Sequence, residues 1–273
     1  MSVPTVDPTE FAGKVAIVTG GSLGIGRATA ERLALGGASV VVNGRRPEHV
    51  EETVAAIRAA GGTAEGVAGD AGVAATSAKL AQTAVERFGG IDILVCSAGI
   101  QRYGTVIDTS EEMWDEVMTI NLKAMFLAAK NAIPEMQRRG GGAIALVSSV
   151  QGLATQKTVA AYSTSKAAII GLARAMAVDH AAENIRVNAV CPASVETPML
   201  RDAAELHKGN STGTATIASW GGMHPLGRVG QPDEVAELIA FLVGPRSSFI
   251  TGAEVKIDGG MMAELGVVLP EHT

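Results

Sequence analysis

Cysteine is nearly absent from this chain of 273 residues, which contains only Cys96 and Cys191. Both follow apolar runs that predict buried strands, so we expect reduced, inert thiols. Metal-ligand spacing is also absent, and we expect no bound metal. Excess positive charge is missing too, because the formal net charge is −6 and the arginine pairs 45–46 and 138–139 form no stripe. This excludes the class of nucleic-acid binders.

Long apolar stretches are missing as well. No uninterrupted run reaches the length that crosses a bilayer, and residues 1–10 lack the basic and apolar regions of a secretory signal. We therefore expect a soluble, cytoplasmic protein. Internal repeats and low-complexity segments do not occur. Hydrophobic residues make up 47% of the chain and charged residues 18%, which supports a sizeable core.

Apolar runs alternate with stretches of helical periodicity, which indicates parallel βαβ units with right-handed crossovers. The runs that predict strands are 15–19, 38–42, 63–68, 91–95, 142–148, 185–190 and 253–257. We predict an α/β fold: a doubly wound parallel sheet of seven strands flanked by helices, of Rossmann type, forming a single domain over residues 1–273. In such sheets ligands bind beyond the carboxyl ends of the strands.

Three segments lie outside this alternation. Residues 1–12 and 261–273 are predicted to be terminal tails. Residues 194–225 follow a strand, are mixed in polarity and contain four glycines, so we expect a long loop. A loop of that length inside a compact domain is usually functional or mobile.

A glycine-rich bend joins the first predicted strand to the first predicted helix. It consists of Gly20, Gly21, Ser22, Leu23, Gly24, Ile25 and Gly26. Glycine permits positive φ and lets a ligand approach the backbone, while the N-terminus of the following helix favours a pyrophosphate. The position of the bend between strand and helix therefore predicts a dinucleotide site.

Tyr162 and Lys166 stand four residues apart in a predicted helix and so share one face. A nearby ammonium can make a phenol a useful acid or base, because a free tyrosine titrates near pH ~10. Ser149, 13 residues before Tyr162, follows a predicted strand and can add a hydroxyl donor. Ser148 is a rival, but alternation of side chains along the strand separates the two serines. Taken alone, the Tyr-x-x-x-Lys spacing also fits an amphipathic helix face.

From Gly13 to Gly260 the chain resembles the short-chain dehydrogenase/reductase family. The glycine motif of that family maps onto Thr19, Gly20, Gly24 and Gly26, and its serine, tyrosine and lysine map onto Ser149, Tyr162 and Lys166. Its helix asparagine maps onto Asn121, which alternatively caps a helix irregularity. The Ser149 spacing to Tyr162 also follows the family.

The resemblance implies hydride transfer between a nicotinamide cofactor and an alcohol/carbonyl pair. Tyr162 would then exchange the proton of the substrate oxygen, and Ser149 would hydrogen-bond that oxygen. Lys166 would lower the pKa of Tyr162 and hold the nicotinamide ribose. Asn121 would support a water chain from Lys166 to solvent.

The end of the second strand bears on the choice of cofactor. An acidic residue there would bind the ribose hydroxyl of NAD, but the sequence continues with Asn43, Gly44, Arg45 and Arg46. Guanidinium groups can bind a phosphate, so we expect NADP(H), with NAD(H) possible. Alternatively, both arginines are solvated residues ahead of a helix. Leu23 occupies a position where NADP-preferring relatives often carry a basic residue.

Other cofactor contacts follow from the resemblance. Asp70, followed by Ala71, matches the adenine-binding position, although an aspartate there also suits a turn or a helix cap. Ala98 and Gly99 keep the close approach to the cofactor, but Cys96 and Ser97 replace the two asparagines usual in the family. After Pro192 the usual glycine is Ala193. Val195 and Thr197 match the positions that hold the nicotinamide amide and the phosphates, with loop packing as the alternative.

The resemblance implies that residues 194–225 are a segment that covers the substrate. The identity of the substrate is less well defined. Candidate wall residues are Gln101, Arg102, Tyr103, Gln151, Gln156, Met199, Leu206, Trp220, Met223 and His224. This mixture suits a polyol, a sugar, a hydroxy acid or a cyclic alcohol or ketone, and His224 is given no catalytic role. Relatives commonly form homotetramers, in which the tail after Gly260 could reach a neighbouring pocket. A nucleotide-sensing binding protein and an oligomeric scaffold remain as alternative functions.

Overall fold

The computed structural model describes residues 6–265, and in them seven parallel strands form one sheet in the order β3-β2-β1-β4-β5-β6-β7. The strands are β1 (Val15–Thr19), β2 (Ser39–Gly44), β3 (Thr63–Ala68), β4 (Ile93–Cys96), β5 (Gly142–Val147), β6 (Ile185–Pro192) and β7 (Glu254–Ile257). The predicted doubly wound sheet is confirmed. Strand ends differ from the expected ones by up to two residues, as where β2 and β6 continue to Gly44 and Pro192.

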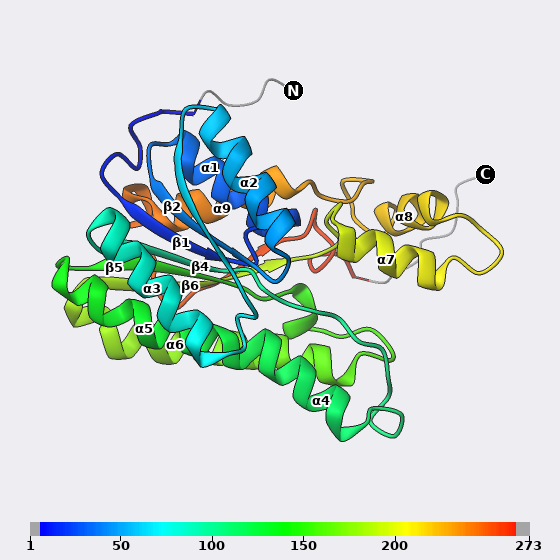
Figure 1. Cartoon of the computed structure of the whole chain (residues 1–273). Helices are drawn as coiled ribbons and strands as arrows, with labels where there is room; N and C mark the ends of the chain where they lie inside the picture. Colours follow the sequence, from blue (N-terminus) through cyan, green and yellow to red (C-terminus); the bar gives the residue numbers. More distant parts are fainter. Residues whose placement is uncertain (1–5, 266–273) are drawn as a thin grey trace.

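Helices cover both faces of the sheet (Figure 1). Their bounds are α1 (Gly24–Leu35), α2 (Pro47–Ala59), α3 (Ala74–Phe88), α4 (Glu111–Met118), α5 (Ala124–Arg138), α6 (Ala160–His180), α7 (Pro198–His207), α8 (Gly213–Gly221) and α9 (Pro232–Val243). One core cluster joins the sheet to α1, α2 and α9, and the other joins it to α3, α5 and α6. Neighbouring β5 residues such as Ile144 and Ala145 belong to opposite clusters, as strand alternation requires.

The order in which strands are added to the sheet reverses between β1 and β4. These two strands are adjacent in space, although β2 and β3 separate them in sequence. Helix α1 after β1 and helix α5 after β4 therefore pack on opposite faces of the sheet, and no crossover covers the carboxyl ends of β1 and β4. The glycine bend follows β1 here, and Ala98 and Gly99 follow β4. This edge carries the candidate site.

The expected loop over residues 194–225 is wrong in one respect, because the segment contains the two helices α7 and α8, joined by a short turn (Figure 1). Local capping explains the difference. The Thr197 hydroxyl accepts a hydrogen bond from Leu200 N at 3.3 Å, Pro198 starts α7, and the Thr212 hydroxyl accepts from Ala215 N at 3.2 Å. Both helices project from the sheet edge that carries the candidate site.

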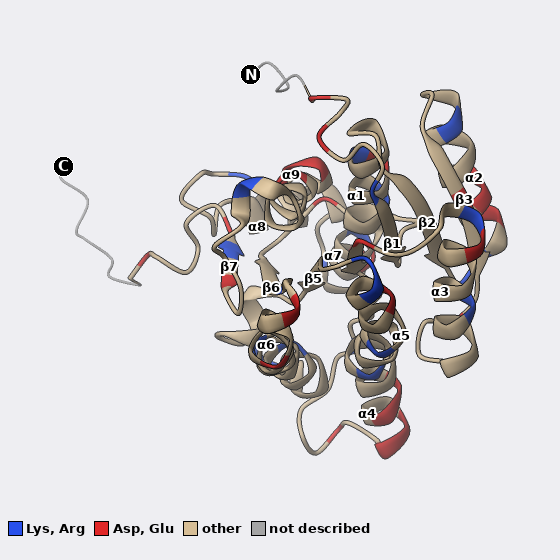
Figure 2. Cartoon of the chain, turned by 90° about the vertical axis from the view of Figure 1, so that its left-hand side faces the viewer, with Lys and Arg blue, Asp and Glu red and all other residues tan. Residues whose placement is uncertain are grey.

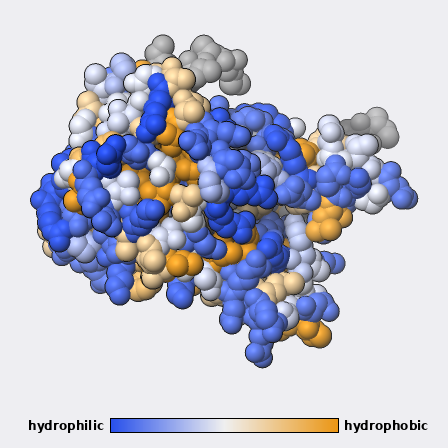
Figure 3. All heavy atoms as spheres, viewed as in Figure 1, coloured by the Kyte–Doolittle hydropathy of each residue, from blue (hydrophilic) through white to orange (hydrophobic). Residues whose placement is uncertain are grey.

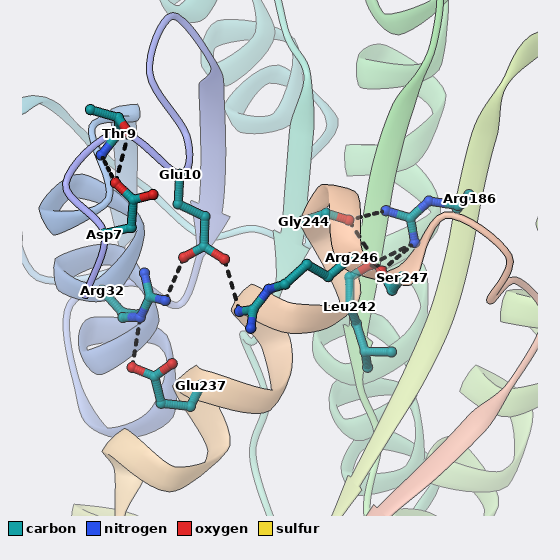
Figure 4. A network of polar contacts seen from close by, with 10 residues as sticks. All are labelled: Asp7, Thr9, Glu10, Arg32, Arg186, Glu237, Leu242, Gly244, Arg246 and Ser247. Atoms are coloured by element: carbon teal, nitrogen blue, oxygen red, sulfur yellow. Dashed lines mark hydrogen bonds and ion pairs between the residues drawn. The ribbon is translucent and has the colours of Figure 1, made fainter. Parts of the chain in front are cut away.

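The chain before β1 packs on the domain through one buried ring and one network of ion pairs. Phe11 is only 1% exposed. Glu10 pairs with Arg32 of α1 at 2.6 Å and with Arg246 at 3.0 Å, and Arg32 also contacts Glu237 of α9 at 2.6 Å (Figure 4). These pairs join α1 to α9. Residues 1–5 and 266–273 of the predicted tails lie outside the described residues.

Acidic and basic residues are interspersed over the helices, with acidic side chains gathered at the start of α4 (Figure 2). The face seen in Figure 3 is mainly hydrophilic, and hydrophobic surface appears where α7 lies. Met199 and Leu206 of α7 are 38% and 64% exposed. Across residues 6–265, no helix is both long and apolar enough to cross a membrane.

Candidate active site

The glycine bend brings backbone close to backbone. Gly20 and Gly24 have φ of +65° and +52°, which glycine adopts without strain. A Cβ on Gly20 would lie 2.6 Å from Ala98 N, and one on Gly26 would lie 2.2 Å from Gly20 O. Side chains at these two positions would force the bend apart. The predicted need for glycine is thus met by the packing of β1, α1 and the turn after β4.

The residues between these glycines take different environments. Leu23 is 43% exposed, while Ile25 packs partly buried against the core. Ser22 is buried against Gly44, where a Cβ would lie 2.2 Å from Ser22 Oγ. Across the bend, Thr197 Cγ2 lies 3.0 Å from where a Cβ on Gly24 would be. The segment before α7 thus contacts the glycine bend, as the predicted role of Thr197 requires.

The end of β2 presents two exposed arginines and no carboxylate. Arg45 and Arg46 are exposed, and neither forms an ion pair within the described part of the chain. Asn43 is buried and donates from Nδ2 to the carbonyls of Val67 and Gly69, both at 3.0 Å. Its amide therefore holds β2 to β3, which leaves the two guanidinium groups as the free polar groups of this turn.

Asp70 and Ala71 follow β3 at the same edge. Asp70 Oδ1 accepts a hydrogen bond from Gly72 N at 2.8 Å, so the turn foreseen as an alternative is present, while the second carboxylate oxygen stays free within residues 6–265. Ala71 is 5% exposed. Pro192 ends β6, and Val195, three residues further along the chain, is buried. Turn formation and adenine binding are compatible, since one oxygen serves each.

Tyr162, Lys166 and Ser149 meet beyond the ends of β5 and β6. Lys166 Nζ lies 5.5 Å from the centre of the Tyr162 ring and donates to the Val147 carbonyl at 3.0 Å. The Ser149 hydroxyl accepts from Gln151 N at 3.1 Å and donates to the Pro192 carbonyl at 3.4 Å. All three side chains are buried. The two hydroxyls and the ammonium can thus act on one small group.

Burial dominates the protonation of this cluster. Burial raises the pKa of Tyr162 to about 12. The hydrogen bond with the Ser149 side chain acts to lower this pKa, and electrostatic repulsion by an ionised Tyr103 acts to raise it. Burial also lowers the pKa of Lys166 to about 8. In the ligand-free chain, burial therefore outweighs the lowering of the Tyr162 pKa that was expected from Lys166. At pH 7 the site holds a neutral phenol beside an ammonium.

Asn121 connects the reaction centre to the turn after β4. It lies in a π-helical turn, Thr119–Lys123, so the foreseen helix irregularity is real. Its Oδ1 accepts from Ile100 N at 2.8 Å, and its Nδ2 donates to Ile100 O and to Ser165 Oγ, both at 3.0 Å. Ser165 in turn donates to the Tyr162 carbonyl at 2.7 Å. Ser165 was not predicted, although its spacing of three from Tyr162 on the buried face could have indicated it.

Gly99 joins the two halves of the site. A Cβ there would lie 3.4 Å from Asn121 Oδ1 and 3.6 Å from Lys166 Nζ, while the preceding Ala98 N lies against Gly20. The glycine bend is therefore continuous with the Tyr162 cluster through two residues. Such an edge can hold a dinucleotide with its reactive end at the buried hydroxyls.

Comparison with known proteins agrees with this geometry. A family model described as Enoyl-(Acyl carrier protein) reductase matches residues 20–262. Dehydrogenase/reductase SDR family member 4 of Oryctolagus cuniculus is 37% identical over 256 residues, which are 93% of this chain and 96% of that protein. This chain belongs to the short-chain dehydrogenase/reductase family.

Two further relatives fit this oxidoreductase family. An uncharacterized oxidoreductase of Thermotoga maritima is 39% identical over 253 residues, 93% of this chain and 99% of its own. The ligand-free structure of an aldohexose dehydrogenase from Thermoplasma acidophilum superimposes with a TM-score of 0.88 at 36% identity, covering 96% and 99% of the two chains. The chain is accordingly an oxidoreductase of the short-chain dehydrogenase/reductase family.

The two departures from the usual family sequence are accommodated by packing. Burial raises the pKa of Cys96 to about 12, and a hydrogen bond between its side chain and that of Thr19 acts against this rise. Ser97 N donates to the Thr19 carbonyl at 3.0 Å. Ala193 has an ordinary φ, and its N–H donates to the Ile257 carbonyl at 3.2 Å. Neither departure strains the cofactor side of this family member.

Some of the candidate wall residues have side chains that are hydrogen-bonded within the protein, and others keep polar atoms that a substrate could bind. Arg102 forms two hydrogen bonds with Glu116 of α4 at 2.9 and 2.7 Å, and Ser148, the rival serine, donates to the Lys166 carbonyl at 2.7 Å. His224 is 3% exposed and contacts the Trp220 carbonyl through Nδ1 at 2.9 Å. These contacts are structural. Tyr103 and Gln151 keep polar atoms that no residue among 6–265 satisfies, and so does His224, whose buried Nε2 has no partner there.

Proposed function

We propose that this protein is an NADP(H)-dependent short-chain dehydrogenase/reductase that interconverts an alcohol and a carbonyl group on a small polyhydroxylated substrate. The supporting observation is the buried cluster of Tyr162, Lys166 and Ser149, continuous through Gly99 with the glycine bend. A protein that only senses nucleotides does not need this set of side chains.

The residues of the edge fit a dinucleotide. The bend of Gly20, Gly24 and Gly26 would hold a pyrophosphate at the start of α1, and Thr197, which lies against Gly24, would contact the same group. Arg45 and Arg46 would hold a ribose phosphate, and Asp70 would hold the adenine amino group. When bound, the nicotinamide supplies the hydride acceptor or donor.

The chain's own residues would manage the proton. Tyr162, a neutral phenol at pH 7, donates its proton to the carbonyl oxygen in the direction of reduction. The Ser149 hydroxyl gives up its long hydrogen bond to the Pro192 carbonyl and donates to the same substrate oxygen as negative charge develops there. The Lys166 ammonium stabilises the tyrosinate left behind, and Val147 O fixes its position. Asn121 holds the turn that carries Gly99 in place.

A substrate with several hydroxyls is favoured over a hydroxy acid. Arg102, the arginine among the candidate wall residues, is already paired with Glu116 and so is not available to bind a carboxylate. The aldohexose dehydrogenase with 36% identity supports a sugar or polyol. A cyclic alcohol or ketone is the second candidate class.

The function is tested by a panel of polyols, sugars, hydroxy acids and cyclic alcohols or ketones, assayed with NAD(H) and NADP(H) in parallel. We expect turnover of a polyol or sugar with NADP+ and weaker turnover with NAD+. Tight cofactor binding without turnover of any compound would instead favour the sensing protein.

Removal of the arginine pair is expected to change cofactor preference. In the double variant Arg45→Ala and Arg46→Ala, the Kd for NADP+ should rise about 10- to 100-fold, since hydrogen bonds to a charged group contribute about 1.5–3 kcal/mol. The Kd for NAD+ should change by less than about threefold. Arg87→Ala, at the far end of α3, is the matched control. Equal loss of both cofactors, or of neither, would contradict the preference for NADP(H).

We also propose a homotetramer assembled through α5 and α6, the helices next to Asn121 and bearing Tyr162. Exposed apolar side chains support it, since Phe126 of α5 is 48% and Val178 of α6 is 80% exposed. Sedimentation should give four chains, and the variant Phe126→Glu with Val178→Glu should dissociate them. A monomeric wild-type protein would exclude this assembly.

A further inference from the structure

Tyr103 is placed beside the reaction centre by backbone hydrogen bonds. The next residue, Gly104, donates from N to the Thr158 carbonyl at 2.7 Å, and its own carbonyl accepts from Ala160 N at 3.2 Å. Ala160 begins α6, and Tyr162 follows in the first turn of that helix. The loop after β4 is thereby joined to the start of α6. The electrostatic effect of Tyr103 on the pKa of Tyr162 agrees with this proximity.

The ring of Tyr103 also contacts the end of α7, in the segment 194–225. Its centroid lies 4.5 Å from that of His207 with the planes at 75°, an edge-to-face pair. His207 is the last residue of α7, so the contact links the loop after β4 to the segment that projects over the site. The two residues are 104 positions apart in sequence, and only the folded site brings them together.

The hydroxyl of Tyr103 has no hydrogen-bond partner within residues 6–265, although the side chain is half-buried. Its neighbour Arg102 is fully engaged by Glu116. A ring fixed by the backbone of Gly104 and by His207, with a free hydroxyl on the loop that is joined to the start of α6, is suited to bind a polar ligand group. A second oxygen of the substrate would satisfy it.

We propose that Tyr103 is a specificity-determining residue whose hydroxyl hydrogen-bonds a second hydroxyl group of the substrate, and that His207 is a positioning residue for its ring. The inference rests on the proposed function and narrows it to substrates with a hydroxyl near the reacting carbon, such as vicinal diols, cyclic polyols and sugars. A mono-alcohol of the same shape makes no use of Tyr103.

The test measures binding in an inactive background, so that it does not depend on turnover. In the Tyr162→Phe variant with NADP+ present, ligand-observed NMR gives the Kd of cis-1,2-cyclohexanediol and of the matched cyclohexanol. Adding Tyr103→Phe keeps the ring and removes the hydroxyl. We expect the Kd of the diol to rise roughly 3- to 10-fold, as loss of one hydrogen bond predicts, and that of cyclohexanol to change by less than about twofold.

The positioning role of His207 is tested by removing its ring and then replacing it with another aromatic ring. His207→Ala should weaken the diol by a similar factor and leave cyclohexanol unchanged, and His207→Phe should restore the diol because the edge-to-face contact returns. Equal effects on both ligands, no effect on either, or a diol that binds no more tightly than cyclohexanol would overturn the proposal. Wild-type protein that shows the diol preference yet transfers no hydride would reject the proposed function alone.

Discussion

Replacing Tyr162 by Phe is expected to lower kcat by about 10²- to 10⁴-fold, the usual contribution of a positioned general acid or base. Tyr162 is buried beside Ser149, and its phenol is neutral at pH 7 because burial raises its pKa to about 12. Phe fills the same space but has no proton to give. Steady-state kinetics with the substrate found in the panel measures the loss.

The same variant separates chemistry from binding. The glycine bend and Arg45 are untouched, so the Kd for NADP+ should stay within about threefold of wild type, and the fold should be intact by circular dichroism. If turnover persisted at the wild-type rate, Tyr162 would have no role in the reaction. If cofactor binding were lost as well, the variant would report on the dinucleotide site rather than on proton transfer.

Replacing Lys166 by Met is expected to abolish most activity and yet to stabilise the protein. Lys166 is 5% exposed, and burial lowers its pKa to about 8. Within residues 6–265 its Nζ has a single hydrogen bond, to the Val147 carbonyl. At pH 7 the folded state bears a desolvated ammonium that costs about 3 kcal/mol. Leaving Val147 O unpaired offsets about 1–2 kcal/mol of the gain. The free energy of unfolding should rise by roughly 1–2 kcal/mol.

The pH dependence of that gain identifies its source. Between about pH 8 and pH 10.5 the unfolded wild-type chain holds a proton on Lys166 that the folded chain has released, so wild-type stability rises with pH in this window. The advantage of the Met variant should therefore be largest below pH 8 and should shrink towards pH 10.5. Urea unfolding at several pH values measures it, with Lys79→Met on the surface of α3 as control. A pH-independent difference would assign the effect to packing.

The fold was largely predictable because its signals are local, and the candidate site residues lie in motifs that are equally local. Each strand is a short apolar run, the glycine bend is contiguous, and Tyr162 and Lys166 share a helix face by spacing alone. The positions of Ser149 and Asn121 followed from a family pattern rather than from physics. The position of Asn121 now has a physical basis in its hydrogen bonds to Ile100 and Ser165, and that of Ser149 in its hydrogen bonds with Gln151 and Pro192.

What could not be predicted depends on tertiary packing. Helices α7 and α8 are short and glycine-flanked, so their threonine caps were overlooked in a segment that resembles a loop. The pKa of Tyr162 is set by how completely the chain buries the phenol, which no spacing reveals. The contacts of Tyr103 with His207, and of Glu10 with Arg246, join residues far apart in sequence.

We propose that hydride passes directly between substrate and nicotinamide at the Tyr162 cluster. The most direct measurement incubates the enzyme with NADP+ and the active alcohol deuterated at its carbinol carbon, followed by mass spectrometry of the reduced cofactor. We expect one deuterium on the nicotinamide ring for each carbonyl formed by the wild-type enzyme, and almost no deuterated cofactor with Tyr162→Phe. Carbonyl product with an undeuterated cofactor, or deuterium released to water, would contradict it.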